Sequence, residues 1–232
     1  MRLNGTTLNT RETEQIIEDL IGDEHVSTSA DTPMREDAFE LDDITKIERI
    51  ENHFREIMNI LGLDLTDDSL RGTPKRVAKM YVKEIFSGLD PRNKPEIALF
   101  ENKYKYKEML VEKDITFYSN CEHHFVPIIG KAHVAYISNG KVIGLSKINR
   151  VVQYFAKRPQ VQERLTVQIA EELKRVLQTD DVAVVIDASH LCVSSRGVQD
   201  ISSQTVTAHY SGKFSEDSTK NEFLTYVNMS KA

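Results

Sequence analysis

The chain lacks the features that mark secreted and membrane proteins. Its 232 residues include only two cysteines, no tryptophan and no apolar run long enough for a transmembrane helix, which needs about 18 residues. The N-terminus also lacks the basic and then apolar pattern of a secretory signal peptide. We therefore expect a cytoplasmic protein with no membrane partner, in which thiols stay reduced and are free to bind a metal.

Negative charge is concentrated at one end of the sequence. The formal net charge is −6, yet residues 1–43 hold 12 Asp and Glu against 3 Arg, and the remaining residues hold 24 acidic and 27 basic side chains. We interpret residues 1–43 as an acidic, mobile extension with a short helix around Glu14 to Ile21. The mildly basic remainder suits an anionic small molecule and not nucleic acid, which would call for a dense basic face.

Both cysteines lie in short motifs that also contain histidine. Residues 120–125 read NCEHHF and residues 189–192 read SHLC. Thiolate and imidazole are the ligands that zinc prefers, and a catalytic zinc usually has three protein ligands and a fourth position for water. The sequence therefore predicts a zinc site. The alternatives are two buried, inert cysteines or a disulfide between Cys121 and Cys192, which is the weakest interpretation in a reducing compartment.

The spacing leaves open which histidine completes this site. If residues 121–124 are extended, Cys121 and His123 share a face because side chains alternate along a strand. If the segment turns, Cys121 and His124 converge instead. His190 lies two positions from Cys192 and is a third candidate. The histidines that do not bind metal would be neighbouring groups or proton carriers.

The periodicity of apolar residues predicts helices first and a mixed pattern afterwards. The expected helices and strands are residues 44–61, 73–88, 146–158 and 160–177 as helices, and 109–118, 125–137, 141–145, 182–186 and 203–210 as strands, with a short closing segment at 223–227. Asn139-Gly140 predicts a hairpin that pairs 141–145 with 125–137, and Gly130 predicts an irregularity in the latter strand. The sum is an α+β domain with mainly antiparallel strands and helices on one face.

The start of the helix at 146–158 has the composition of a phosphate site. Ser146 is a plausible N-cap, and Lys147 and Arg150 lie in the first turn. Free backbone N–H groups, the positive end of the helix dipole and two cations would converge there. A surface helix with ordinary charges explains the same residues equally well.

Four ordered segments closely resemble the zinc-dependent type of GTP cyclohydrolase I. They are residues 120–125, 144–150 (GLSKINR), 158–166 (RPQVQERLT) and 190–197 (HLCVSSRG), and the resemblance runs from about Ile44 to Val227. It implies the tunnelling fold, in which subunits close their antiparallel sheets into barrels. We accordingly expect a catalytic domain at 44–232, made of N-terminal helices at 44–90 and a tunnelling-fold core at 105–232.

The resemblance also implies an activity and an assembly. The family converts GTP and water to 7,8-dihydroneopterin triphosphate and formate, the entry to tetrahydrofolate and, in some organisms, biopterin. Its members are homodecamers built from two pentameric rings, with active sites between subunits. GTP would then be the substrate and further copies of the chain the partners.

Residue roles follow from the same resemblance. Zn2+ would be held by Cys121, His124 and Cys192, and general acid and base work would fall to His123 and His190. Glu163, with Gln162 as a helper, would bind the guanine edge. The residues implied near the triphosphate or ribose are Ser146, Lys147, Arg150, Arg196 and Arg76.

Two other functions compete with this interpretation. A tunnelling-fold relative could act on another purine or pterin, although the whole zinc, guanine and phosphate set is retained here. A zinc-stabilised binding module without catalysis is the other, but structural zinc sites usually have four ligands, often in Cys-x-x-Cys pairs, and this chain has none.

Overall fold

The computed structural model describes residues 2–3, 6–7 and 29–229, and the chain divides into two compact units, 1–33 and 34–232. In the first unit, β1 (Arg2–Leu3) pairs antiparallel with β2 (Thr6–Thr7). The helix predicted around residues 14–21 lies outside the described residues. The roles predicted for 1–43, 44–90 and 105–232 stay predictions.

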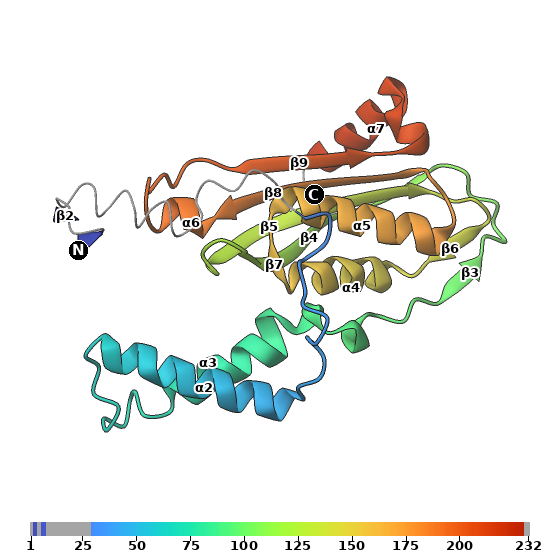
Figure 1. Cartoon of the computed structure of the whole chain (residues 1–232). Coiled ribbons are helices and arrows are strands. Elements are labelled where there is room, and N and C mark those ends of the chain that lie inside the picture. The colour runs from blue at the N-terminus through green and yellow to red at the C-terminus, as the bar shows by residue number, and fades with distance from the viewer. Residues whose placement is uncertain (1, 4–5, 8–28, 230–232) are drawn as a thin grey trace. The chain divides into compact units, whose positions relative to one another are not determined.

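A five-stranded sheet forms the centre of the second unit (Figure 1). Its order is β7 (Pro159–Gln160), β4 (Met109–Cys121), β5 (Pro127–Ile137), β8 (Val182–His190) and β9 (Thr205–Tyr210). The neighbours pair antiparallel except β7, which runs parallel to β4. The predicted α+β class with a mainly antiparallel sheet is confirmed.

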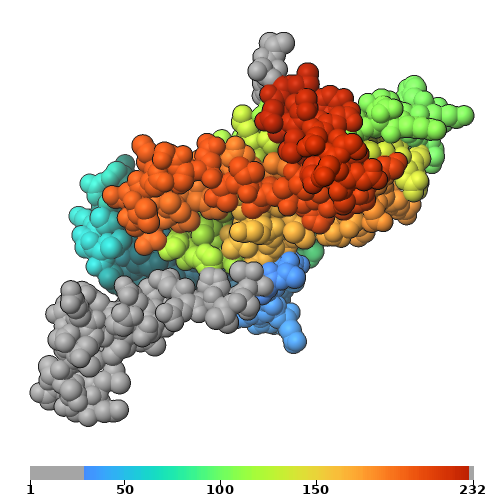
Figure 2. Space-filling view, turned by 90° about the horizontal axis from the view of Figure 1, so that it is seen from above, coloured from blue at the N-terminus to red at the C-terminus, as the bar shows by residue number. Residues whose placement is uncertain are grey.

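Helices cover both faces of this sheet, so the prediction of helices on one face is wrong. α4 (Leu145–Ala156) and α5 (Gln162–Leu177) pack on one face, where Phe117, Tyr136 and Ile186 are buried with the apolar sides of both helices. On the opposite face, α7 (Asp217–Asn228) packs through Phe223. Figure 2, seen from that side, shows the residues of α7 in red on the face toward the viewer.

The strand at 141–145 does not form the predicted hairpin. β6 (Lys141–Ile143) pairs instead with β3 (Leu99–Glu101) in a separate two-stranded sheet. The reason is that β5 already has β4 on one edge and β8 on the other up to Tyr136, so no edge is left for β6. The turn at Gly140, with φ 92°, is present without the pairing it predicted.

The sheet irregularity also lies elsewhere than predicted. It falls in β4 between Glu112 and Ile115, where Asp114 has φ 59° and its backbone N–H donates to His133 Nδ1 at 3.2 Å. Gly130 pairs regularly with both neighbouring strands. Glycine is needed there for close approach, because a Cβ would lie 2.5 Å from the Cβ of Ala188.

The helices before the sheet include α2 (Asp43–Ile60) and α3 (Thr73–Met80). The helix predicted at 73–88 is only partly an α-helix. After α3 the chain continues as a π-helix, η1 (Tyr81–Ile85), and then as two 3₁₀ turns, η2 (Ser87–Leu89) and η3 (Pro91–Asn93). Asp42 caps α2 by accepting from the Thr45 N–H. In the part of the chain that the structure describes, no helix has the length and apolar content to cross a membrane.

Gly88 joins these helices to the C-terminal end of α4. Its N–H donates to Lys157 O at 2.9 Å, and its carbonyl accepts from Arg158 Nε at 2.8 Å. The Arg158 guanidinium also stacks on the rings of Tyr154 and Phe155, at 4.7 and 4.8 Å from their centroids. A Cβ at Gly88 would lie 2.0 Å from Tyr154 O. The contact therefore requires glycine.

We predict that Gly88→Ala lowers the thermal unfolding midpoint markedly. The added methyl must push backbone apart, and such overpacking costs about 1–3 kcal/mol. Gly144→Ala is the matched control, because its Cβ would meet nothing nearer than Lys147 Cγ at 3.9 Å. Equal midpoints for the two variants in differential scanning calorimetry would contradict this account of the junction.

Candidate active site

Three segments bring together side chains that could hold a metal ion. Cys121 ends β4, His124 lies in the loop that follows, and Cys192 lies in the short helix α6 (Leu191–Ser194) after β8. Their ligand atoms all lie within 4.8 Å of one another. The structure thus places His124, of the three candidates, beside the two thiols. His123 points its Nδ1 to within 3.7 Å of Cys121 Sγ.

The electrostatics of the two thiols fit a bound cation. Burial, reinforced by the neighbouring Cys121, raises the pKa of the Cys192 thiol above its ordinary value. Two thiolates this close repel each other, so ionising both thiols is unfavourable unless a positive charge lies between them. Arg196 Nη1 lies 2.8 Å from His124 Nε2 and donates to it, because a guanidinium can only donate, so a metal bound through Nε2 would take the place of this contact. The donor set of two thiols and one imidazole is the kind that zinc prefers.

Backbone hydrogen bonds hold the loop between Cys121 and Val126 in a tight turn. Cys121 N–H donates to Val126 O at 2.9 Å, and Phe125 N–H donates to Cys121 O at 2.8 Å. Phe125 has φ 53°, a conformation that costs a residue with a side chain about 1 kcal/mol or more. The Asn120 amide donates to the Phe125 carbonyl at 3.1 Å. The Phe125 ring packs on the ring of Phe86, with centroids 5.0 Å apart. These contacts stabilise the strained turn that presents His124.

A buried ion pair ties the same loop to the start of α5. Arg164 Nη1 and Nη2 lie 2.5 and 3.2 Å from the two carboxylate oxygens of Glu122. The Arg164 side chain is 3% exposed and that of Glu122 19%. Glu122 N–H also donates to Gln160 O at 3.0 Å. A bidentate pair of this kind fixes orientation as well as distance.

The start of α5 carries two adjacent residues in opposite environments. Gln162 is 1% exposed, and its Oε1 lies 2.7 Å from His190 Nε2, whereas Glu163 is exposed. Burial lowers the pKa of His190 below its ordinary value, and the charge of Glu163 opposes this only in part. This environment favours the neutral imidazole, which can accept a proton.

The residues predicted to bind phosphate lie apart from this cluster. Ser146 is inside α4 and not its cap, which is Gly144. α4 runs beside β4, with Asn149 bonded to Glu112 at 3.2 Å and Gln153 to the carbonyl of Thr116 at 2.7 Å. Glu112 precedes Cys121 by nine residues, one of them the extra residue of the bulge, so at about 3.3 Å per strand residue Asn149 lies about 25 Å from Cys121 along β4.

The predicted phosphate residues have other contacts in this chain. Lys147 Nζ donates to Glu96 O at 2.7 Å, and Arg76 Nη2 donates to Thr73 Oγ1 at 2.9 Å. Arg150 lines a pocket of about 460 Å³ between α4 and the preceding turns. Only Arg196, of the five, lies beside the metal-ligand set.

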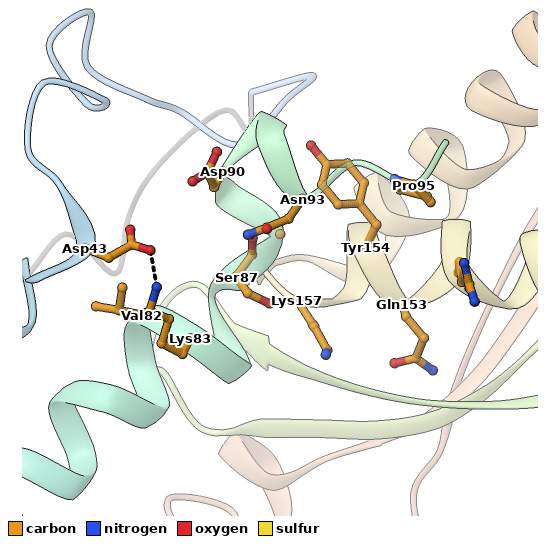
Figure 3. A pocket seen from close by; sticks show the side chains of 12 residues that line it. Asp43, Val82, Lys83, Ser87, Asp90, Asn93, Pro95, Gln153, Tyr154 and Lys157 are labelled. Atoms are coloured by element: carbon orange, nitrogen blue, oxygen red, sulfur yellow. Dashed lines mark hydrogen bonds and ion pairs between the residues drawn. The ribbon is translucent and has the colours of Figure 1, made fainter. Parts of the chain in front are cut away.

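Figure 3 shows this pocket near Arg150 from close by. Asp43 and Lys83 form an ion pair on one side, and Gln153 and Lys157 project from the α4 side. Its charges are mixed, because Asp90 lines it as well and is engaged by Arg92 at 2.5 Å. It contains none of the metal-ligand residues.

Comparison with known proteins identifies the family. The sequence profile of GTP cyclohydrolase I matches residues 50–228. The chain belongs to the GTP cyclohydrolase I family. The GTP cyclohydrolase 1 of Flavobacterium johnsoniae is 62% identical over 211 residues, which cover 91% of this chain and 95% of that protein. The GTP cyclohydrolase 1 of Vibrio cholerae is 62% identical over 180 residues, which cover 77% of this chain and 83% of that protein.

A more distant relative agrees with this assignment. The GTP cyclohydrolase 1 of Salmonella arizonae is 55% identical over 209 residues, covering 90% of this chain and 94% of that protein. A solved structure of an archaeosine synthase QueF-Like protein aligns with 47% of this chain and 97% of its own, at a TM-score of 0.40 and 19% identity. That likeness is too weak to bear on the fold.

All the site residues that the sequence predicted lie within the matched range 50–228, and their individual roles stay predictions. Sequence reasoning missed the supporting residues Glu122, Arg164 and Phe125. Glu122 and Arg164 lie inside two of the family-like segments, but only the fold shows that side chains 42 positions apart form a pair. No spacing signal could have revealed it.

We predict that Arg164→Met weakens metal binding by about 10- to 100-fold, the usual effect of removing a residue that supports metal ligands. Without its partner, the Glu122 carboxylate loses the contact that fixes the loop between Cys121 and His124. Competition with a chelator of known affinity measures the change. Lys174→Met on the same helix, which removes an ion pair with the exposed Glu171, is the control. Unchanged affinity in Arg164→Met would contradict the role of the pair.

Proposed function

We propose that this chain is a GTP cyclohydrolase I, which hydrolyses GTP at C8 of guanine to release formate and form 7,8-dihydroneopterin triphosphate. The observation that carries the proposal is the grouping of the Cys121, His124 and Cys192 ligand atoms within 4.8 Å of one another, in a chain 62% identical to a GTP cyclohydrolase 1 over 91% of its length. The product would enter tetrahydrofolate or another pterin pathway.

Zn2+ is the proposed cofactor, held by Cys121, His124 and Cys192. When bound, a zinc ion lowers the pKa of water and makes it nucleophilic near neutral pH, which the weak electrophile C8 of guanine requires. Three protein ligands leave one position for that water. Because two thiols must stay reduced to bind the ion, we place the protein in the cytoplasm.

Guanine recognition is assigned to Glu163. The N1–H and the 2-amino group of guanine are parallel donors, and one carboxylate can accept from both. Glu163 is exposed in the first turn of α5, where the helix dipole stabilises a negative charge. A site that hydrogen-bonds both groups rejects purines that lack one of them.

Proton transfers are assigned to His190 and His123. Opening the imidazole ring of guanine requires protons on nitrogen, and histidine is the side chain with a pKa nearest the working pH. His190, kept neutral by burial, can accept a proton. His123 is exposed in the metal-ligand loop, where it can exchange protons with solvent.

The triphosphate would be neutralised by Arg196 and by residues of a second copy. The separation of about 25 Å along β4 is too large for one GTP molecule to touch both the metal-ligand set and the start of α4 in one chain. Ser146, Lys147, Arg150 and Arg76 would therefore serve the site of a neighbouring subunit. Their cations suit an anionic ligand at a helix N-terminus.

The assembly proposed is a homodecamer of two pentamers with sheets closed into barrels, the tunnelling fold. Among the strands that the structure describes, β9 pairs with β8 alone, and β4 has only the short β7 on its outer edge. Open edges of this kind are normally covered in native proteins. Ile57 and Ile60 of α2 are 49% and 83% exposed, and its C-cap Leu61 is 70% exposed, which is typical of a surface that another subunit buries.

The proposal predicts different defects for two single variants. Cys192→Ala should lose both zinc and formate release from GTP, because two ligands do not hold the ion. Glu163→Ala should keep one zinc per chain and lose turnover by at least about 100-fold. Zinc by mass spectrometry, formate release and pterin fluorescence measure these outcomes. Normal turnover of GTP by either variant, or none by the zinc-loaded wild type, would refute the assignment.

A further inference from the structure

The amide of Gln162 is held in a single orientation by its neighbours. Its Nε2 lies 2.8 Å from Thr205 O, 3.2 Å from Ile186 O and 3.1 Å from Thr207 Oγ1. Carbonyl oxygens only accept, so the NH₂ end of the amide must face them. The flipped amide would bury its oxygen against two carbonyl oxygens, with no hydrogen available to either.

Two hydroxyl groups support this orientation. Thr166 Oγ1 donates to Gln162 O at 2.8 Å, so its one hydrogen is used. Thr207 Oγ1, 2.7 Å from Thr166 Oγ1, must then donate to it. That leaves Thr207 Oγ1 to accept from Gln162 Nε2. The hydrogen bonds thus run from Gln162 Nε2 to Thr207 Oγ1, from there to Thr166 Oγ1, and back to the backbone carbonyl of Gln162. Each bond of this closed ring has only one possible direction.

The orientation decides which nitrogen of His190 carries hydrogen. Gln162 Oε1 lies 2.7 Å from His190 Nε2, and an amide oxygen only accepts. Nε2 therefore bears the hydrogen. A neutral imidazole has one N–H, so Nδ1 keeps its lone pair. His190 would meet the substrate with Nδ1 as its proton-accepting atom.

We infer that Gln162 is a positioning residue, which orients His190 and fixes its tautomer and does not contact guanine. Both ends of its amide are occupied within the protein and its side chain is buried, whereas the adjacent Glu163 is exposed and available to a ligand. The expected effect of Gln162 on GTP turnover rests on the proposed function. It replaces the helper role toward guanine that the family resemblance implies for Gln162.

Steady-state kinetics separate the two roles. If Gln162 positions His190, Gln162→Met lowers kcat for GTP by about 100-fold, leaves KM within about twofold, and keeps the preference for GTP over inosine triphosphate, which lacks the 2-amino group. Glu163→Gln is the matched neighbour and should raise KM and weaken that preference. A raised KM and lost preference in Gln162→Met, with kcat unchanged, would overturn the inference, as would wild-type kinetics.

Two further variants test the same role of Gln162 in case Gln162→Met does not fold. A buried glutamic acid keeps its proton and so offers one donor and one acceptor. The kcat of Gln162→Glu should therefore be at least about tenfold higher than that of Gln162→Met. Thr207→Val removes the hydroxyl that accepts from Nε2 and should lower kcat by a few fold at unchanged KM. If both variants fold, bind zinc and change KM instead of kcat, the inference is wrong.

The tautomer can be measured without turnover. In zinc-loaded protein with ¹⁵N-labelled histidine, solid-state NMR distinguishes protonated from unprotonated ring nitrogens, and a His190→Gln sample identifies the signals of His190. We expect a protonated Nε2 and an unprotonated Nδ1. The opposite pattern would overturn the inference even in an active enzyme, and the expected pattern in a protein inactive on GTP would locate the failure in the proposed function.

Discussion

The parallel pairing of β7 with β4 is the constraint on which the rest of the site depends. It consists of two residue pairs, Asn120 with Pro159 and Cys121 with Gln160. α5 begins two residues after β7 ends, so this short ladder places the start of the helix beside the end of β4. The ion pair between Glu122 and Arg164 extends the same contact by side chains. The metal loop and Glu163 are thereby held at a fixed separation.

The register of β8 supplies the other half of the site. Ile128 pairs with His190 at the same end of the sheet, and Cys192 follows in α6. The antiparallel ladder therefore delivers one histidine and one thiol to the loop that starts at Cys121. Gln162 then links the helix to the strand through His190. Three segments distant in sequence are joined by a few directional contacts, most of them shielded from water, where such contacts are strong.

Sequence periodicity predicted the local elements well and their pairing less well. Helices 44–61 and 160–177 and the strands after residue 109 follow from apolar spacing, because burial on one face imposes that spacing. The partner of β6 could not be predicted, since it depends on which sheet edges remain free. The face that α7 covers depends likewise on tertiary packing: Phe223 alone does not say against which side of the sheet it lies.

The site shows the same division between local and long-range information. The motifs around Cys121 and Cys192 predicted a metal centre from residue type alone, and the fold then placed His124 and not His123 in the group of ligand atoms. The environment of Gln162 was hidden, because its partners lie 24 to 45 positions away. The distance between the metal-ligand set and Arg150 was equally invisible in the sequence. It follows from α4 lying alongside β4.

We propose that one functional site needs residues from two copies of the chain. Subunit complementation tests it most directly: Glu163→Ala and Arg150→Ala chains are co-expressed, and the mixed oligomer is assayed for formate release from GTP. Each variant alone should be nearly inactive, whereas equal mixing should restore about a quarter of the wild-type activity, because that share of interfaces pairs two intact halves. Mixed oligomers that stay as inactive as their parents would contradict the shared site.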